Sequence, residues 1–182
     1  MIITGSYPNL RMRRSRKYAW SRKLIQENEL SYSDFVLPIF LTEGSNKKIP
    51  IKTMPGVYRY SINKLSSKID IAIKKGIPMI ALFPQTNKKL KNNIGSEALN
   101  ENNLVCRGIR YIKKRYKNQI GIMCDVALDP YTSHGHDGLL KKKEILNDET
   151  NSILVKQSLL QANMGCDVLA PSDMMDGRIK LI

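Results

Sequence analysis

The sequence has no long apolar run, and this absence argues against a membrane protein. No stretch of about 18 or more apolar residues occurs, and no signal-like apolar segment stands near the start, where 1–5 gives way to the basic run Arg11-Met-Arg-Arg. We therefore expect no membrane partner and a cytoplasmic location. With 42% hydrophobic and 25% charged residues among 182, the chain can bury a core and is not expected to be disordered.

Cysteine and histidine are both scarce, which limits the possible metal and disulfide chemistry. The three cysteines, Cys106, Cys124 and Cys166, are an odd number without CxxC spacing, so no disulfide framework is indicated. Two of them fall inside expected strands, and we expect reduced, mostly packed thiols. The chain has 2 histidines, His134 and His136, and no third that could complete a histidine-rich metal centre.

Acidic residues are too few to balance the basic ones, and the formal net charge is +14. The excess is densest in residues 11–23, where seven arginines and lysines precede the first acid, Glu27. A basic arm raises nucleic acid as a partner. However, no RNP, KH or helix-turn-helix pattern is visible, so we expect no nucleic-acid partner and keep a nucleic-acid-binding protein as an alternative.

Short apolar runs alternate with helical patterns along the rest of the chain. Strand-like runs occupy 35–41, 79–83, 120–124 and 166–170. Helical stripes lie between them: one over 62–73 that stops at Gly76, one over 104–112, and one formed by Leu154, Val155, Leu159 and Ala162 that stops at Gly165. Parallel strands joined by helical crossovers are predicted.

Two folds fit this alternation, an open doubly wound sheet and a (β/α)₈ TIM barrel. The first expected strand is followed by Leu41-Thr-Glu-Gly-Ser, which lacks the glycine-rich G-x-G-x-x-G turn of dinucleotide-binding sheets. The barrel is therefore favoured. A complete barrel needs about 250 residues, so we predict an N-terminal basic arm at 1–30, which would contact another subunit, and the first four βα units of a barrel at 31–182.

The densest site chemistry lies in Cys124-Asp-Val-Ala-Leu-Asp-Pro-Tyr-Thr-Ser-His-Gly-His-Asp-Gly138. This segment holds both histidines and three aspartates, and it follows an apolar strand. In α/β enzymes the loops after the strands build the active site. His134 and His136 suggest a second alternative, a metal-dependent TIM-barrel hydrolase, but they follow Pro130 in an expected loop. We expect them to form hydrogen bonds in an active-site lid.

The same segment, together with Ala170-Pro-Ser-Asp-Met-Met-Asp-Gly-Arg178, resembles the porphobilinogen synthase (delta-aminolevulinic acid dehydratase) family. Further matching motifs occur in the family's order, at 11–14, 54–59, 82–84, 95–98 and 107–110. The resemblance implies a tetrapyrrole and haem pathway lyase that condenses two 5-aminolevulinate molecules into porphobilinogen with loss of water. It also implies a homo-octamer in which the N-terminal arm holds a neighbouring subunit.

The family's reaction uses two lysines that form Schiff bases with the substrate. By this resemblance the two lysines lie on later strands, beyond Ile182, as do the arginines, serine and tyrosine that bind substrate. No lysine in the printed residues takes a matching position. We therefore expect these residues to be a fragment, C-terminally truncated relative to the family and inactive alone.

The resemblance also assigns roles within the motifs. Zinc-type members carry three cysteines where this chain has Ala127, Asp129 and Asp137, so zinc is not expected and magnesium is the possible metal, held by the two aspartates. This pattern resembles the magnesium-type, non-cysteine branch. Asp125 is implied as the supporting acid beside the first Schiff-base lysine.

Ser172 is the candidate substrate-binding residue, and its role has an alternative. As the residue after the fourth expected strand, it would lie at the barrel mouth and could form a hydrogen bond with substrate. Ser172 or Asp173 could instead be the N-cap of the helix expected to follow that strand. We expect Arg59 and Arg178 to be ion-paired structural residues.

Overall fold

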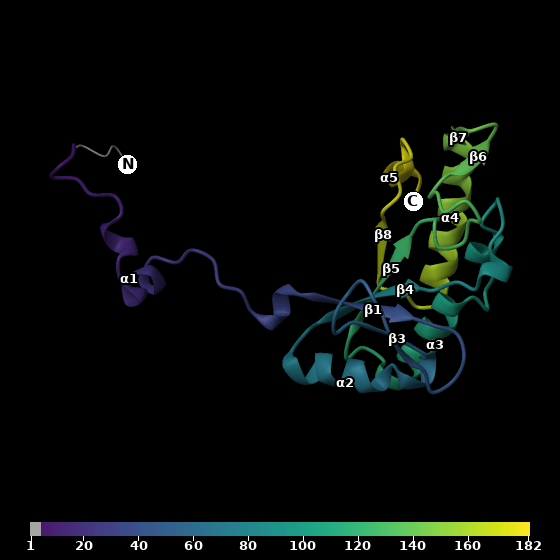
Figure 1. The fold of residues 1–182 in the computed structure, drawn as a ribbon, viewed down its shortest axis with the longest axis horizontal. Helices are drawn as coiled ribbons and strands as arrows, with labels where there is room; N and C mark the ends of the chain where they lie inside the picture. The colour runs from purple at the N-terminus through teal and green to yellow at the C-terminus, as the bar shows by residue number, and fades with distance from the viewer. Residues whose placement is uncertain (1–4) are drawn as a thin grey trace. The chain divides into compact units, whose positions relative to one another are not determined.

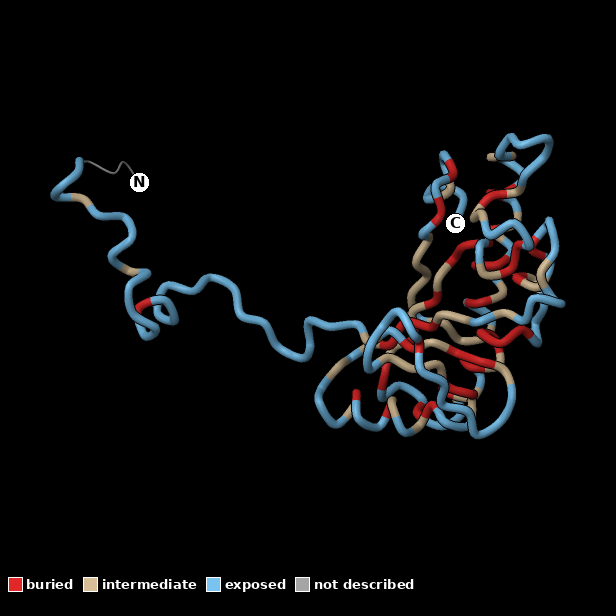
Figure 2. Tube along the Cα trace, in the orientation of Figure 1, coloured by how far each residue is buried: buried red, intermediate tan, exposed pale blue. Residues whose placement is uncertain are grey.

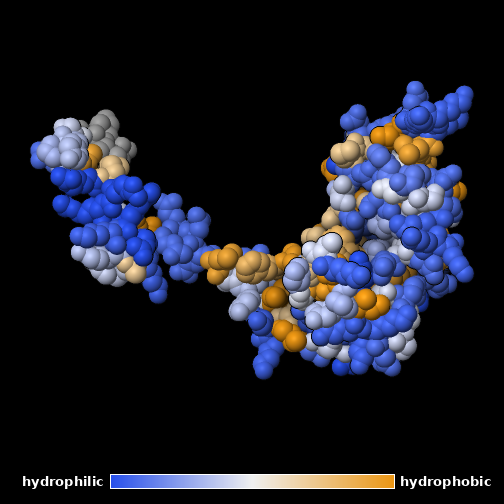
Figure 3. Space-filling model, viewed as in Figure 1, coloured by the Kyte–Doolittle hydropathy of each residue, from blue (hydrophilic) through white to orange (hydrophobic). Residues whose placement is uncertain are grey.

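A computed structural model describes residues 5–182. The chain divides into two compact units, Met1–Ser31 and Tyr32–Ile182. The first unit contains the 3-10 turn η1 (Arg14–Arg16) and the short helix α1 (Ala19–Leu24). Its residues are mostly exposed, and Ser21 is the one buried residue within 5–31 (Figure 2). Figure 3 colours this unit mainly as hydrophilic. This basic unit therefore has almost no core of its own.

The second unit is built on a six-stranded sheet with the strand order β2-β3-β1-β4-β5-β8 (Figure 1). Four of its strands match the four apolar runs of the sequence: β1 (Val36–Leu41), β4 (Met79–Pro84), β5 (Gly121–Val126) and β8 (Val168–Pro171). Each of these pairs in parallel with the next in that order. The predicted parallel sheet is confirmed, and its carboxyl ends all lie at one edge.

Two short antiparallel pairings were not predicted from the sequence. Strand β3 (Tyr58–Tyr60) runs parallel to the end of β1 and antiparallel to β2 (Lys48–Pro50). Strands β6 (Leu139–Lys141) and β7 (Glu144–Leu146) form a separate hairpin. The hairpin turns through Lys142 and Lys143, whose φ angles of 50° and 72° are left-handed. Such a turn usually carries Asn-Gly, so the lysines gave no hairpin signal.

Helices connect the parallel strands, as the alternation predicts. They are α2 (Ser66–Lys75), α3 (Leu104–Tyr116), α4 (Asn147–Asn163) and the short α5 (Arg178–Leu181), with 3-10 turns η2 (Tyr32–Asp34), η3 (Ile62–Lys64), η4 (Lys88–Leu90) and η5 (Ser96–Leu99). Gly76 ends α2 in the left-handed region at φ 78°, and its N–H bonds to the Ala72 and Ile73 carbonyls. This C-terminal signal was predicted correctly. Within the described residues no helix is both long enough and apolar enough to span a membrane.

The main core lies where α3 packs against β1 and β4 (Figure 1). Strand residues such as Ile80 and Ile122, and helix residues such as Ile109 and Ile112, are completely buried there. Each such side chain contributes about 1.5–3 kcal/mol through burial. These residues come from the apolar runs and the stripe of α3 that the sequence predicts, and they fix the sheet on which the strand ends are held.

The face of helix α4 that is buried against the rest of the protein differs from the face that its hydropathy predicts. Leu154 is completely buried, but Leu159 is 60% exposed, and Ala162 is exposed too. The buried face is instead mostly polar and consists of Thr150, Asn151, Leu154, Gln157, Ser158 and Gln161. The predicted helix is confirmed and Leu154 is buried as expected, but the predicted burial of Leu159 and Ala162 is wrong. The physical reason is that side chains on this polar face donate hydrogen bonds to the backbone at the end of strand β5.

Candidate active site

Asp125 and Ser172 meet at the carboxyl ends of two neighbouring strands. Asp125 is the penultimate residue of β5, and Ser172 directly follows β8. The register of the two strands pairs Asp125 with Ala170 and Val126 with Pro171, which places the two side chains at the same edge. The Ser172 hydroxyl donates a short hydrogen bond to Asp125 Oδ1. The structure thus joins two residues that are 47 positions apart in the sequence.

A cavity of about 330 Å³ opens beside Asp125 at this edge of the sheet. Its walls come from the ends of β1, β3, β4 and β5 and the loops that follow: Phe40, Arg59, Phe83, Pro84, Gln85, Thr86, Lys91, Asp125, Asp129 and Pro130. The Phe40 and Phe83 rings pack together at 5.6 Å and give the cavity an apolar side. Charged groups of both signs line it, so it suits a small zwitterionic ligand.

Burial controls the ionisation of Asp125. The pKa of its carboxyl is raised above the ordinary value, first because burial disfavours the charged form. The hydrogen bond from Ser172 opposes this rise, and the negative charge of Asp173 adds to it. A carboxyl with a raised pKa, held at a cavity, is a candidate to accept and return a proton.

Asp129 and Asp137, the two candidate metal ligands, lie close enough to influence each other electrostatically. The pKa of Asp129 is raised by partial burial, then by the charges of Asp125 and Asp137, while Lys91 opposes the rise. Asp137 Oδ1 lies 3.1 Å from His136 Nδ1. Across residues 5–182, no group of three or more histidine, cysteine or acidic side chains is arranged to hold a metal ion.

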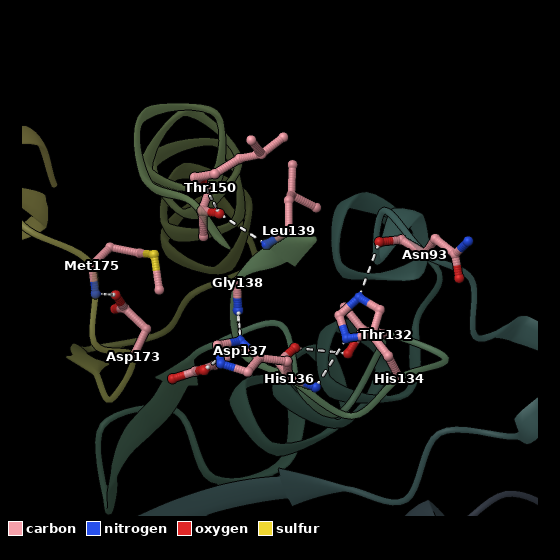
Figure 4. A network of polar contacts seen from close by, with 11 residues as sticks. Asn93, Thr132, His134, His136, Asp137, Gly138, Leu139, Thr150, Asp173 and Met175 are labelled. Atoms are coloured by element: carbon pink, nitrogen blue, oxygen red, sulfur yellow. Dashed lines mark hydrogen bonds and ion pairs between the residues drawn. The ribbon is translucent and has the colours of Figure 1, made fainter. Parts of the chain in front are cut away.

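The two histidines belong to a hydrogen-bonded loop (Figure 4). His134 Nδ1 accepts the His136 backbone N–H at 3.1 Å, and His134 Nε2 lies 3.3 Å from the Asn93 carbonyl oxygen, which only a protonated nitrogen can bond. His136 Nδ1 accepts the Gly138 backbone N–H at 2.9 Å. Both nitrogens of His134 are therefore occupied, and the pair does not form a metal-binding couple. Their predicted position in a loop is confirmed.

The segment after β8 is a loop rather than the start of a helix. Helix α5 begins only at Arg178, and its N-cap residue is Gly177, with φ 80°. The proposed N-cap roles of Ser172 and Asp173 are therefore wrong. Asp173 Oδ1 instead accepts the Met175 N–H at 2.7 Å, and Asp173 Oδ2 lies 3.0 Å from Arg178 Nε (Figure 4 shows the first contact). The expected ion pairing of Arg178 is confirmed, and it fixes the loop that carries Ser172.

Two glutamines that the sequence analysis missed hold the backbone of the site strand. Gln161 Nε2 donates to the Asp125 carbonyl oxygen at 2.9 Å, and Gln157 Nε2 donates to the Ala127 carbonyl oxygen at 3.2 Å. The two amides thus satisfy backbone carbonyls at the end of β5 and directly after it. The sequence does contain a signal, because Asn151, Leu154, Gln157, Ser158 and Gln161 recur at helical spacing.

Arg59 and Lys91 are further charged residues at the cavity that had no assigned role there. Lys91 Nζ donates to the Asp129 carbonyl oxygen at 3.2 Å. Arg59 lies on β3, in register with Phe40 of β1, and it forms no ion pair with another residue of the described chain. The expected structural ion pair of Arg59 is therefore not found. Its place at the cavity depends on the unpredicted pairing of β3 with β1.

Parallel βα units with an acid, a hydroxyl and a cavity at the carboxyl ends of the strands place this unit in the class of TIM-barrel folds. A sequence model described as delta-aminolevulinic acid dehydratase matches residues 9–182. The chain belongs to the delta-aminolevulinic acid dehydratase family, as its motifs suggest. The comparisons give no support to a nucleic-acid-binding protein or to a hydrolase.

Curated relatives and a solved structure show how far the similarity extends. The chain is 53% identical over 173 residues to the delta-aminolevulinic acid dehydratase of Bradyrhizobium diazoefficiens, covering 95% of this chain and 49% of the relative. It is 42% identical to that of Chlamydia pneumoniae, covering 94% and 52%. A crystal structure of the Toxoplasma gondii ME49 enzyme, in complex with the reaction product porphobilinogen, matches with a TM-score of 0.89 and 38% identity, covering 93% of this chain and 48% of that one. The 182 residues thus span about half the length of these relatives, and the predicted TIM-barrel class is confirmed.

Proposed function

We propose that these residues form the N-terminal half of the catalytic barrel of a porphobilinogen synthase, a lyase that condenses two molecules of 5-aminolevulinate to porphobilinogen. The observation that carries this proposal is the contact between Asp125 and Ser172 at a cavity of about 330 Å³, in a chain of this family. The Toxoplasma gondii structure contains the reaction product porphobilinogen, which supports the same product for this chain's family.

In this proposal Asp125 is the acid–base residue of this half of the site. Burial raises the pKa of this carboxyl, which favours its protonated form, and the Ser172 hydrogen bond orients Oδ1. A substrate amino group beside Asp125 would be held by the carboxylate and would donate a proton to it. The Schiff-base lysines implied by the family lie outside the residues printed here, so this half is expected to be inactive alone.

We propose magnesium as the metal that the carboxylates of this half of the site would bind. Asp129 and Asp137 offer two carboxylates, which select a hard ion such as magnesium over zinc, and Ala127 offers no ligand. Two carboxylates are short of the set that holds magnesium alone, so an ion here would need water or further ligands. No step of the reaction is assigned to it.

We also propose an assembly and a location for the protein. The described part of the first unit, residues 5–31, has almost no core, and its exposed Trp20, Leu24 and Ile25 need a covering surface. This supports the expected role of the arm in a homo-oligomer, which is an octamer by the family resemblance. We propose a cytoplasmic location, where the three cysteines, which are free in the structure, would stay reduced.

A chimera tests this function directly. Residues 1–182 would be joined in frame to the second half of the Bradyrhizobium diazoefficiens relative, to which this chain is 53% identical. We expect the chimera to form porphobilinogen from 5-aminolevulinate, and borohydride to trap a covalent adduct in its second half. Asp125→Asn should lower kcat by about 100-fold or more, as expected for loss of a general acid–base group.

Two variants sharpen the interpretation. Ser172→Ala should lower activity less than Asp125→Asn, because it removes only the orienting hydrogen bond. Asp148→Asn, at an exposed position in the first turn of α4, is the matched control and should leave activity unchanged. If the chimera traps substrate normally and its Asp125→Asn variant retains full activity, Asp125 is not the acid–base residue.

A further inference from the structure

Lys91 brings a positive charge to the acidic wall of the cavity. Its Nζ atom donates to the backbone carbonyl oxygen of Asp129 at 3.2 Å, and the two residues are 38 positions apart in the sequence. Lys91, Asp125 and Asp129 line the same cavity of about 330 Å³. Lys91 is half-buried, whereas Lys88 and Lys89 on η4 are exposed. An ammonium thus lies beside a residue that we propose as a metal ligand.

Backbone hydrogen bonds between two loops hold Lys91 in this position. The N–H of the next residue, Asn92, bonds to the Tyr131 carbonyl at 3.3 Å, and the Asn92 carbonyl accepts the Ser133 N–H at 3.0 Å. These bonds tie the loop after β4 to the loop after β5 that carries Asp129. The approach of Lys91 to Asp129 therefore does not depend on one flexible side chain alone.

The Lys91 ammonium and a metal ion would act on the same carboxylate. Burial and the charges of Asp125 and Asp137 raise the pKa of Asp129, and the charge of Lys91 acts in the opposite direction. Lys91 thus helps to keep the carboxylate ionised without a metal ion. The same positive charge repels a divalent cation that approaches Asp129.

We propose that Lys91 is a built-in cation of the acidic wall, which lowers the affinity of Asp129 for a divalent metal ion. This inference rests on the metal site proposed at Asp129 and Asp137, and it assigns no step of the reaction to a metal. Asp129 is exposed in residues 5–182, so its surroundings resemble water and the repulsion is moderate. An uncharged side chain in place of Lys91 should therefore raise the affinity for a divalent ion about tenfold.

Manganese binding to the 182-residue chain tests this proposal. Mn²⁺ prefers oxygen ligands, as magnesium does, and the electron paramagnetic resonance signal of the free ion reports how much is bound. The parent chain and Lys91→Met would be titrated after circular dichroism and gel filtration have shown both to be folded and monodisperse. The titration uses low ionic strength, because salt screens exposed charges. We expect Lys91→Met to bind Mn²⁺ about tenfold more tightly than the parent chain.

Three further variants locate the effect. Lys91→Arg keeps the charge and should keep the affinity of the parent chain. Lys89→Met removes the same charge at an exposed position that does not line the cavity, so it controls for the change in net charge. It should alter the affinity by less than about twofold. Lys91→Met combined with Asp129→Asn should lose the gain, because the repelled ion binds at Asp129.

The possible outcomes separate clearly. Measurable binding by Lys91→Met alone would also support the proposal. It is overturned if Lys91→Met binds no more tightly than the parent chain, or if no chain binds Mn²⁺ measurably. An equal gain in Lys89→Met, or a gain that survives Asp129→Asn, would overturn it too. Because the readout is binding, a chimera that forms no porphobilinogen would refute the proposed function and leave this result to be judged separately.

Discussion

Gln161 offers a sharp test of how helix α4 supports the strand that carries Asp125. Its side chain is 2% exposed and donates to the Asp125 carbonyl oxygen at 2.9 Å. Gln161→Met keeps the side-chain length but removes the donor, leaving a buried carbonyl unpaired at a cost of about 1–3 kcal/mol. The Gln161 Oε1 atom has no partner among the described residues, so its removal returns part of this cost. We expect a net loss of about 1 kcal/mol in the free energy of unfolding.

The measurement is a urea titration followed by far-UV circular dichroism, at protein concentrations where the chain is monomeric. Leu159→Gln is the matched control, since Leu159 lies on the same helix and is 60% exposed. It should change stability by no more than about 0.5 kcal/mol. If Leu159→Gln were the destabilising change and Gln161→Met were neutral, the hydropathy pattern would be right about the buried face of α4, and our account of the polar face would be wrong.

Four further predictions follow from the fold and the site. Gly76→Ala should cost about 1–2 kcal/mol of stability, because alanine pays for the left-handed backbone at φ 78°, and Gly76→Asn should cost less; equal stability in urea titrations would contradict this. Ile122→Ala should cost about 2–5 kcal/mol, because Ile122 is completely buried, whereas a near-neutral result would mean that the core is loosely packed. The pKa of Asp125 is raised in the folded chain, so its protonated form favours folding, and this stability is lost as pH rises through the raised pKa; Asp125→Asn should lack this loss in denaturation curves measured across pH. Purified chain should contain no stoichiometric zinc by elemental analysis, because Ala127, Asp129 and Asp137 provide no thiolate.

The sheet could be predicted because buried parallel strands are short apolar runs with no alternation. The four expected strands became β1, β4, β5 and β8, and Gly76 ended α2 as expected. The three-residue strands β2 and β3 could not be predicted, since a segment such as Tyr58–Tyr60 is too short to show a period. They are determined by pairing with β1, which no local pattern encodes.

The sequence analysis named two residues of the site but did not predict how they contact each other. Asp125 and Ser172 were both named as candidates, but their direct hydrogen bond depends on the register between β5 and β8. The capping role suggested for Ser172 was wrong because a loop of several residues precedes α5. Arg59 reaches the cavity only because β3 pairs with β1, so its position there had no signal in the sequence.

The polar buried face of α4 has a consequence for protein engineering. At about 100° per residue, the centre of the observed face lies roughly 80° around the helix from the centre of the stripe read from hydropathy. A redesign that placed leucines by that stripe would aim them at solvent and would leave the carbonyls of Asp125 and Ala127 without their glutamine donors. Leu159, by contrast, is a position where a polar or tagged residue could be introduced without disturbing the strand. In this helix Leu159 is the editable position, whereas the buried Leu154 and the amides of Gln157 and Gln161 are to be preserved.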